Sequence, residues 1–300
     1  MSCLASERES GSGRLYGGLA ALADRYDGYI LDLWGVLHDG IQAFPWAVDC
    51  LAQLRARAKR VLILSNAPRR TDAIAARCAE LGIVAEHYDA LMSSGEDAWR
   101  HLKERPDAWY QALGERCYHL GPERDLGMRV GLAYAFVDRL EDADFILITG
   151  ALSAEDTADA YTPLLQEALR RQLPMVCANP DLVVYRGARM EICAGTVAAR
   201  YEQLGGEVRY HGKPHSDIYH TCLGLFGGMA PERILAVGDS LRTDVVGAHA
   251  VGLDALFIAS GIHKDELVGE SGDAVDLEKL DALYEKRGAR PRGALLKFSW

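Results

Sequence analysis

Four short polar motifs, each placed directly after an apolar run or a glycine, constrain the fold of this chain more than any other feature. They are Asp32, Ser65-Asn66, Lys213 in Gly212-Lys213-Pro214, and Asp239 with Asp244 five residues later. The runs 29–31, 61–64 and 234–238 have the length and the boundaries of buried parallel strands. Ligands of open parallel sheets bind just beyond the carboxyl ends of the strands. We therefore expect a carboxylate nucleophile, a hydroxyl, an amine and two further carboxylates at one edge, as Mg²⁺-assisted chemistry on a phosphate requires.

Strand and helix patterns alternate along the chain, which predicts an α/β fold with a doubly wound parallel sheet. Helical spacing follows the first two strands, and the second of these helices should start near Pro68 and stop at Gly82. A further α/β segment lies between the second and third motifs, with predicted strands at 144–150, 173–178, 182–185 and 190–192. Because the motifs occur only in the first and last segments, we predict a discontinuous core of residues 1–99 and 208–300. The predicted inserted α/β domain is residues 100–207.

Size and composition narrow the class of protein. Three hundred residues exceed the size at which a single hydrophobic core usually stops growing, which favours two domains. The net charge of −10 disfavours a nucleic-acid backbone as partner. No apolar stretch approaches the ~20 residues of a membrane span, and the polar segment 1–18 lacks the apolar core of a signal peptide. Seven cysteines without a Cys-x-x-Cys pair indicate reduced, mostly buried thiols, so we expect a soluble cytoplasmic protein.

Taken singly, each motif residue has an ordinary structural explanation. Asp32 could cap a turn, Ser65-Asn66 could cap a helix, and Lys213 could be a surface lysine. Asp239 and Asp244 could serve only to charge the start of a helix. The occurrence of all four motifs at predicted strand ends favours one shared phosphate site.

In this order and spacing, residues 32–40, 65–66, 212–214 and 238–244 resemble the four motifs of the haloacid dehalogenase (HAD) superfamily. The α/β insert between the second and third motifs resembles that of the class IIA (NagD-like) branch. The resemblance covers nearly the whole chain, about residues 26–262. It implies a Rossmann-like HAD core with an inserted C2-type cap domain, and a phosphatase that works through an aspartyl-phosphate.

The resemblance also implies a role for each motif residue, with Asp32 as the nucleophile and Lys213 as a second catalytic group. The implied Mg²⁺ ligands are side-chain oxygens of Asp32, Asp239 and Asp244 and the main-chain carbonyl of Trp34. The implied phosphate ligands are Ser65, Asn66 and Lys213. In the insert, Asn179 and Asp181 resemble the substrate-facing loop of class IIA caps. A plain Asn-Pro-Asp turn explains these two residues nearly as well.

Trp34 departs from the family pattern, which usually has a second Asp two residues after the nucleophile. That Asp protonates the leaving oxygen and then activates water, and indole can do neither because its N–H is only a donor. Loss of a general acid–base typically costs about 10²–10⁴-fold in rate. Three interpretations remain open. Another group such as His38, Asp39 or part of the substrate supplies the proton; the enzyme favours acyl or aryl phosphates, which need little protonation; or turnover is lost.

The leading functional prediction is a Mg²⁺-dependent phosphatase of small sugar, nucleotide or cofactor phosphates. The alternative raised by Trp34 is a phospholigand-binding or regulatory protein. A metal-free dehalogenase-type hydrolase is disfavoured by the paired Asp239 and Asp244 and by the large insert. The expected partner is a small phosphorylated metabolite, with no nucleic acid and no membrane, and a homo-oligomer is left open. His211, His215 and His220 lack the spacing of a zinc site, and we expect them to be solvated.

Overall fold

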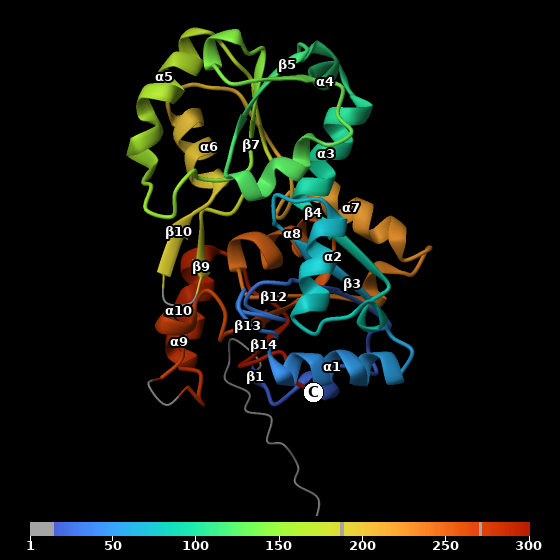
Figure 1. Ribbon diagram of the computed structural model, residues 1–300. Coiled ribbons are helices and arrows are strands. Elements are labelled where there is room, and N and C mark those ends of the chain that lie inside the picture. The colour runs from blue at the N-terminus through green and yellow to red at the C-terminus, as the bar shows by residue number, and fades with distance from the viewer. Residues whose placement is uncertain (1–14, 187–188, 270–271) are drawn as a thin grey trace, which may run out of the picture. The chain divides into compact units, whose positions relative to one another are not determined.

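The computed structural model describes residues 15–186, 189–269 and 272–300 (Figure 1). By its internal contacts the chain divides into two compact units. The first takes in the residues up to Ser65, together with Ala75–Leu91 and Pro214–Trp300. The second comprises Asn66–Ile74 and Met92–Lys213, a range that contains the predicted insert. The domain boundaries at 100 and 207 stay a prediction.

A seven-stranded sheet with the order β1-β14-β13-β12-β2-β3-β4 carries the first unit. Its strands are β1 (Leu15–Tyr16), β2 (Gly28–Leu31), β3 (Arg60–Ser65), β4 (Ala90–Ser93), β12 (Ile234–Gly238), β13 (Asp254–Ile258) and β14 (Gly293–Leu295). From β1 through β3, every neighbouring pair is parallel. The predicted apolar runs became β2, β3 and β12, and nearly all their residues are buried, as expected for strands covered on both faces.

The helices that accompany this sheet lie between its strands in the sequence. They are α1 (Pro45–Ala56), α2 (Thr71–Glu80), α7 (Ser216–Leu225), α8 (Val246–Ala250), α9 (Lys264–Leu267) and α10 (Leu277–Arg287). A π-helical turn, Leu241–Val245, leads directly into α8. In α1, Pro45 occupies the first turn and the buried side chains of Leu51 and Leu54 lie one turn apart, which is the spacing of a helix with one apolar face.

The predicted start of α2 near Pro68 is wrong, because the helix begins at Thr71. The main-chain carbonyl of Ala67 accepts hydrogen bonds from the Gly95 N–H and the Ser94 hydroxyl, and that of Arg69 accepts one from Ser93. These carbonyls bond the segment around Ser93 instead of the first turn of α2, which starts after them.

The second unit has its own five-stranded sheet, with the order β11-β8-β7-β5-β6 and all neighbouring pairs parallel. Its strands are β5 (Arg116–Leu120), β6 (Ala135–Val137), β7 (Phe145–Ile148), β8 (Met175–Cys177) and β11 (Val208–Tyr210). An antiparallel hairpin of β9 (Val183–Arg186) and β10 (Arg189–Ile192) forms a separate two-stranded sheet. The helices of this unit are α3 (Ser94–Glu104), α4 (Ala108–Ala112), α5 (Thr162–Arg170) and α6 (Ala194–Gln203).

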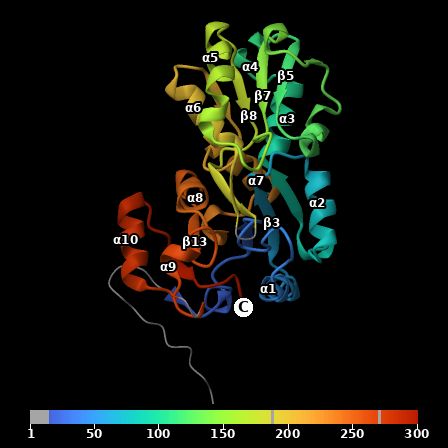
Figure 2. The ribbon, with the colours of Figure 1, turned by 60° about the vertical axis from the view of Figure 1, so that its left-hand side comes forward.

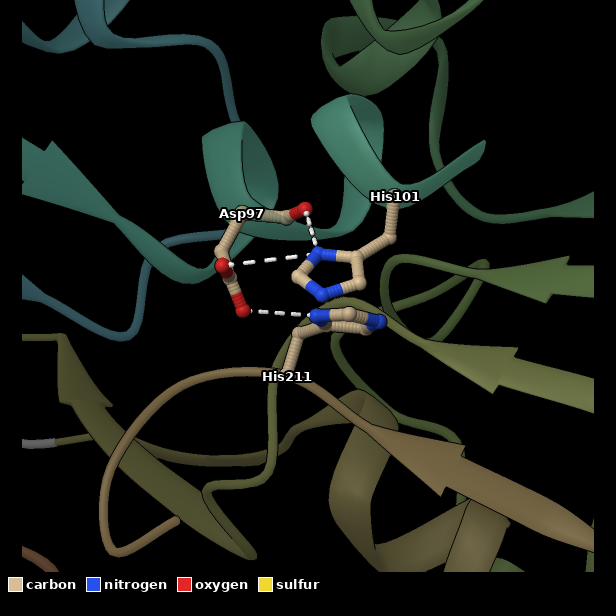
Figure 3. A group of neighbouring side chains, drawn as sticks. All are labelled: Asp97, His101 and His211. Carbon is tan, nitrogen blue, oxygen red and sulfur yellow. Dashed lines mark hydrogen bonds and ion pairs between the residues drawn. The ribbon is translucent and has the colours of Figure 1, made fainter. Parts of the chain in front are cut away.

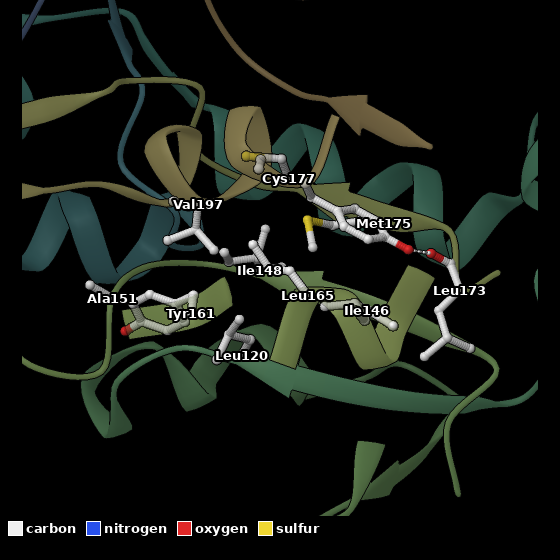
Figure 4. Close-up of a cluster of buried hydrophobic side chains, with 14 of the residues drawn as sticks. Leu120, Ile146, Ile148, Ala151, Tyr161, Leu165, Leu173, Met175, Cys177 and Val197 are labelled. Atoms are coloured by element: carbon white, nitrogen blue, oxygen red, sulfur yellow. Dashed lines mark hydrogen bonds between the residues drawn. The ribbon is translucent and has the colours of Figure 1, made fainter. Parts of the chain in front are cut away.

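Helices cover both faces of the second sheet, as Figures 1 and 2 show for α5 and α6 on one side and α3 and α4 on the other. Alternate strand residues face the two sides. Ile146 and Ile148 join the core beneath α5 and α6 (Figure 4), whereas Phe145 and Leu147 join the core beneath α3. Continuous apolar runs such as 145–148 thus fill two cores at once, which confirms the predicted parallel α/β architecture.

The described cysteines have the reduced, buried state that the sequence predicts. The six cysteines within the described residues are buried and form no disulfide, and Cys3 lies outside these residues, as does most of the polar segment 1–18. Among the described helices, none has the length and apolarity needed to cross a membrane.

Candidate functional site

The two central carboxylates follow neighbouring strands. Chain order runs outward from β2 to β3 in one direction and from β12 to β13 in the other, so the order reverses between β2 and β12. Asp32 comes directly after β2, and its N–H donates to the Val237 carbonyl on β12 at 2.8 Å. Asp239 comes directly after β12. Both residues therefore lie at the topological switch point, where ligands of open α/β sheets bind.

Asp32, Asp239 and Asp244 form one buried acidic cluster. A carboxylate oxygen from each lies within 4.8 Å of the other two, and the three residues are only 9%, 7% and 4% exposed. Three carboxylates this close disfavour one another's charge unless a cation balances them. Hard carboxylate oxygens are the donors that Mg²⁺ prefers, so the residues present fit this ion.

Two glycines leave the space that Asp239 occupies. Gly35 has a φ of +79°, and a Cβ at either Gly35 or Gly261 would overlap the Asp239 Oδ2 atom. The main-chain N–H of Ile262 donates to the same oxygen at 2.7 Å. The backbone thus approaches Asp239 from two loops and holds its carboxylate in one orientation.

Asp244 is held in a comparable way. It lies in the π-helical turn, a geometry that is rare and frequent at functional sites. The Ser240 N–H donates to Asp244 Oδ2 at 3.1 Å, and a Cβ at Gly238 would overlap the Asp244 carboxyl group. The Tyr219 hydroxyl donates to the Asp244 carbonyl at 3.1 Å, which fixes the turn itself.

The glycine beside Asp239 provides a test of this cluster. Gly261→Ala should raise the Mg²⁺ concentration needed to half-saturate the acidic cluster about 10-fold, because the new methyl group displaces the Asp239 Oδ2 atom. Gly224→Ala on α7 is the matched control, since a Cβ there meets nothing within 4 Å. A Mg²⁺ titration that gives the same midpoint for both variants would contradict the assignment.

Ser65 is the last residue of β3, the strand on the other side of β2, and it is buried. The register places Leu31 opposite Ile63, so the carboxyl ends of β2 and β3 bring Asp32 and Ser65 to the same edge of the sheet. This is the placement that the sequence predicts for a phosphate-binding hydroxyl. Its role stays a prediction.

The Trp34 side chain packs against its own loop. Its six-membered ring lies on Gly40, whose φ of +87° and missing Cβ provide the room, and its ring centroid is 5.2 Å from that of His38 in an edge-on arrangement. The Gly40 carbonyl is in turn bonded by Arg77. Trp34 therefore stabilises the loop after Asp32, while the predicted metal role of its carbonyl stays untested.

Neither loop residue suggested as a replacement acid suits that role. Burial lowers the pKa of His38 to about 4, and its Nδ1 accepts the Gly40 N–H, so the ring is neutral near pH 7. Asp39 Oδ1 accepts the N–H groups of Ile41 and Gln42, and hydrogen bonding by these amides holds the pKa of Asp39 below its usual value against a raising effect of partial burial. Asp39 is thus ionised at neutral pH and closes the turn.

In the second unit, Asn66 holds the main chain of Lys213 on both sides. Asn66 Oδ1 accepts the Lys213 N–H at 2.8 Å, and Asn66 Nδ2 donates to the Lys213 carbonyl at 3.0 Å. The same Nδ2 donates to Asp181 Oδ1 at 2.9 Å. Asn66, Lys213 and Asp181 are therefore brought together, although the sequence placed Asp181 in a separate substrate loop.

The Asn179-Pro180-Asp181 loop has structural contacts of its own. Asn179 Oδ1 accepts the Asp181 N–H at 2.9 Å, which is the hydrogen bond of an Asx turn. A Cβ at Gly195, near the start of α6, would come within 2.5 Å of the Pro180 and Asp181 carbonyls. These contacts explain why the loop is compact, and the predicted contact of Asn179 and Asp181 with substrate stays a prediction.

The expectation that His211 is solvated is wrong, whereas His215 and His220 are exposed as expected. His211 is buried against Asp97 on α3, which is 114 residues away in the sequence. Asp97 and its partners Tyr110 and His101 were missed altogether, because their signal is a tertiary contact and no motif marks it.

Comparison with known proteins gives a consistent result. The sequence pattern of the haloacid dehalogenase-like hydrolases matches residues 29–129, and a HAD-hydrolase-like pattern matches residues 210–283. D-glycerol 3-phosphate phosphatase of Mycobacterium tuberculosis is 30% identical over 82% of this chain, and the chain spans 66% of that relative's length. Ribonucleotide monophosphatase NagD of Escherichia coli K12 is 24% identical over 78% of this chain and 87% of its own.

Solved structures show the same likeness. A haloacid dehalogenase-like hydrolase from Brucella suis 1330 is 35% identical with a TM-score of 0.79, and the match covers 93% of this chain and 98% of that one. A glycerol phosphate phosphatase from Mycobacterium tuberculosis in complex with magnesium is 26% identical with a TM-score of 0.62, over 86% of this chain and 77% of that one.

Proposed function

Because this chain belongs to the haloacid dehalogenase-like hydrolases, in the class IIA branch of phosphatases, we propose that it is a Mg²⁺-dependent phosphatase of small phosphate esters. The observation that carries the proposal is the buried acidic cluster of Asp32, Asp239 and Asp244 at the switch point of the sheet. The proposed substrates are small phosphorylated metabolites in the cytoplasm.

Asp32 is the proposed nucleophile. One of its carboxylate oxygens forms a bond to phosphorus while the bond from phosphorus to the ester oxygen breaks, and the leaving oxyanion takes a proton from solvent water. Water then attacks the aspartyl-phosphate, which releases inorganic phosphate and returns the carboxylate of Asp32. Splitting one displacement into two lets a positioned side chain replace water in the harder first step.

Asp239 and Asp244 are proposed to hold Mg²⁺ together with Asp32 and the Trp34 carbonyl. The ion supplies positive charge that offsets the repulsion between the Asp32 carboxylate and the phosphate dianion. The residues prepare this position: Gly35 and Gly261 leave room for Asp239, and the Ile262 N–H fixes one of its oxygens. The magnesium complex of the mycobacterial phosphatase supports the choice of ion.

Ser65 and Lys213 are the proposed phosphate-binding residues, and Asn66 is proposed to act beside them. The Ser65 hydroxyl and the Lys213 ammonium group are donors to phosphate oxygens, where they stabilise the charge that shifts during transfer. Asn66 is already bonded through both amide atoms to the Lys213 main chain. Its role is therefore to position Lys213, a more limited role than the direct phosphate contact that the sequence suggested.

Trp34 directs the choice of leaving group in this proposal. With no Asp at position 34, and with His38 neutral and Asp39 ionised, the loop offers no acid for the ester oxygen. Leaving groups of low basicity, such as aryl and acyl oxygens, need that proton least. We therefore expect aryl and acyl phosphates to be better substrates than alkyl phosphates.

Restoring the acid tests this point. Trp34→Asp should increase kcat/KM for an alkyl phosphate by about 10- to 100-fold and for an aryl phosphate much less, because only the poorer leaving group requires protonation. Trp34→Phe, which keeps an aromatic ring beside His38 and adds no acid, should increase neither. Equal gains on both substrate classes would count against the missing-acid explanation.

A phosphate-release screen tests the function itself. Sugar, nucleotide, acyl and cofactor phosphates are offered with Mg²⁺ and with a chelator, and turnover should require the metal. Hydrolysis that continues in the chelator would exclude the proposed mechanism. Saturable binding of a phosphorylated ligand without turnover would support the binding-protein alternative that Trp34 raises.

A further inference from the structure

Asp97, His211 and Tyr110 form a buried hydrogen-bonded chain in the second unit. His211 Nδ1 lies 2.6 Å from Asp97 Oδ2 (Figure 3), and the Tyr110 hydroxyl contacts His211 Nε2. Asp97 and His211 are each 5% exposed, and Tyr110 is 2% exposed. Burying a carboxylate and an imidazole is unfavourable unless their polar atoms are paired, so a chain paired from end to end holds its members in one geometry.

The Asp97 carboxylate is an acceptor, so His211 Nδ1 carries the hydrogen of that bond. The Tyr110 hydroxyl pairs with His211 Nε2, as the donor where the ring is neutral and as the acceptor where the ring is protonated. In either state, rotation of the His211 ring would break both bonds at once.

His211 is two residues before Lys213, and the intervening main chain has little freedom. The His211 N–H donates to the Cys177 carbonyl at 2.9 Å, which continues the pairing of β11 with β8 by one residue. Gly212 follows with a φ of +103°, and a Cβ there would lie 2.5 Å from Asn66 Oδ1. Asn66 then holds the Lys213 main chain on its far side.

We propose that the Asp97–His211–Tyr110 chain is a positioning device for Lys213, so that side chains from α3 and α4 set the place of the phosphate-binding ammonium group. The inference rests on the proposed role of Lys213 in phosphate binding. His211 anchors the segment on one side and Asn66 on the other, and Gly212 provides the bend between them. Asp97, His211 and Tyr110 are positioning residues, since they act on phosphate only through Lys213.

A metal site is the competing use of the same residues, because Asp97, His101 and His211 each offer a ligand atom within 4.8 Å of the others. The hydrogen bonds favour positioning. Both ring nitrogens of His211 are engaged, one by Asp97 and the other by Tyr110. His101 Nδ1 lies 2.8 Å from the Asp97 main-chain carbonyl, nearer than the 3.6 Å to its carboxylate oxygen.

The test uses Tyr110→Phe in the full-length protein, which removes one hydroxyl and keeps the ring. Tyr134→Phe is the matched control: Tyr134 is also in the second unit, and its hydroxyl bonds Leu102 and Arg105 instead of His211. Tyr110→Phe should lower kcat/KM for an aryl phosphate about 3- to 10-fold, mainly through KM, because a loosened lysine binds phosphate less well. Tyr134→Phe should change kcat/KM less than about 2-fold, even if its Tm falls as much as that of Tyr110→Phe.

A double-mutant cycle separates positioning from general stability. In a Lys213→Met background, Tyr110→Phe should have almost no further effect on kcat/KM, because its route to phosphate is already removed. An undiminished effect in that background would overturn the proposal. So would stoichiometric zinc in the purified protein, lost together with activity on chelation and restored by Zn²⁺, because it would make the cluster a metal site.

Amine labelling gives a readout that does not depend on turnover. Acylation of Lys213 by a small amine reagent, followed by peptide mass spectrometry, should be faster in Tyr110→Phe than in Tyr134→Phe, and inorganic phosphate should protect Lys213 less in Tyr110→Phe. Wild-type protein without turnover or phosphate protection would refute the proposed function. In that case unequal labelling still supports the positioning chain, and equal labelling of the two variants refutes it.

Discussion

Asp32→Asn is expected to abolish phosphate release, with a fall in kcat of at least about 10³-fold, because an amide oxygen does not form the phosphorylated intermediate. The substitution keeps the size and the shape of the side chain at the end of β2. The measurement is single-turnover and steady-state phosphate release from an aryl phosphate in Mg²⁺. Incubation with substrate should label the wild-type protein at Asp32 and leave the variant unlabelled by peptide mass spectrometry.

A folded but inactive variant is the outcome that supports this role. Removing one of three clustered carboxylates relieves repulsion, so the Tm of Asp32→Asn in chelator should equal or exceed that of the wild type. Asp49→Asn, an exposed residue on α1, is the control and should keep full activity. Undiminished turnover by Asp32→Asn would remove Asp32 from the mechanism.

The second large effect is expected at Asp239. Asp239→Asn should raise the Mg²⁺ concentration for half-maximal activity by about 100-fold or more, because a neutral amide replaces a charged oxygen ligand that the backbone holds in place. The activity of Asp239→Asn should be partly recovered at high Mg²⁺, whereas that of Asp32→Asn should not. Activity measured across a Mg²⁺ titration distinguishes the two variants.

Asp217→Asn provides the comparison for Asp239→Asn. Asp217 is exposed in the first turn of α7, outside the acidic cluster. Its substitution should leave the Mg²⁺ midpoint unchanged. If Asp239→Asn also left the midpoint unchanged, Asp239 would not be a metal ligand, and the acidic cluster would have only a structural role.

The strands that carry the acidic cluster could be predicted because their information is local. The runs 29–31, 61–64 and 234–238 are apolar on both faces, and a strand covered on both faces in a parallel sheet has this pattern. In contrast, β5 (Arg116–Leu120) was missed, since its polar Arg116 and His119 interrupt the apolar run. Its partners β6 and β7 supply what the local pattern lacks.

The contacts around Lys213 could not be predicted, because they join distant segments. His211 looks like a surface residue in its own surroundings, and its burial depends on Asp97 in the first turn of α3. That turn is itself buried although it is polar. A single sequence gives no sign of such pairs, and the positioning chain emerges only from the three-dimensional structure.

The glycines of the acidic cluster form an intermediate case. Gly35 and Gly261 are visible in the sequence, but nothing local shows that each leaves room for the same carboxylate. Trp34 was recognised as a departure from the family pattern, while its packing on Gly40 emerged only from the structure. The residue types that make up the site could thus be inferred from the motifs, whereas the orientation of their side chains could not.

The most direct measurement is the position of a divalent ion in crystals grown with Mn²⁺, located by its anomalous scattering. We expect one ion about 2.1 Å from an oxygen of Asp32 and from an oxygen of Asp239, as is usual for a small hard cation held by carboxylates. An ion bound instead by Asp97 and His211, with none between Asp32 and Asp239, would contradict it.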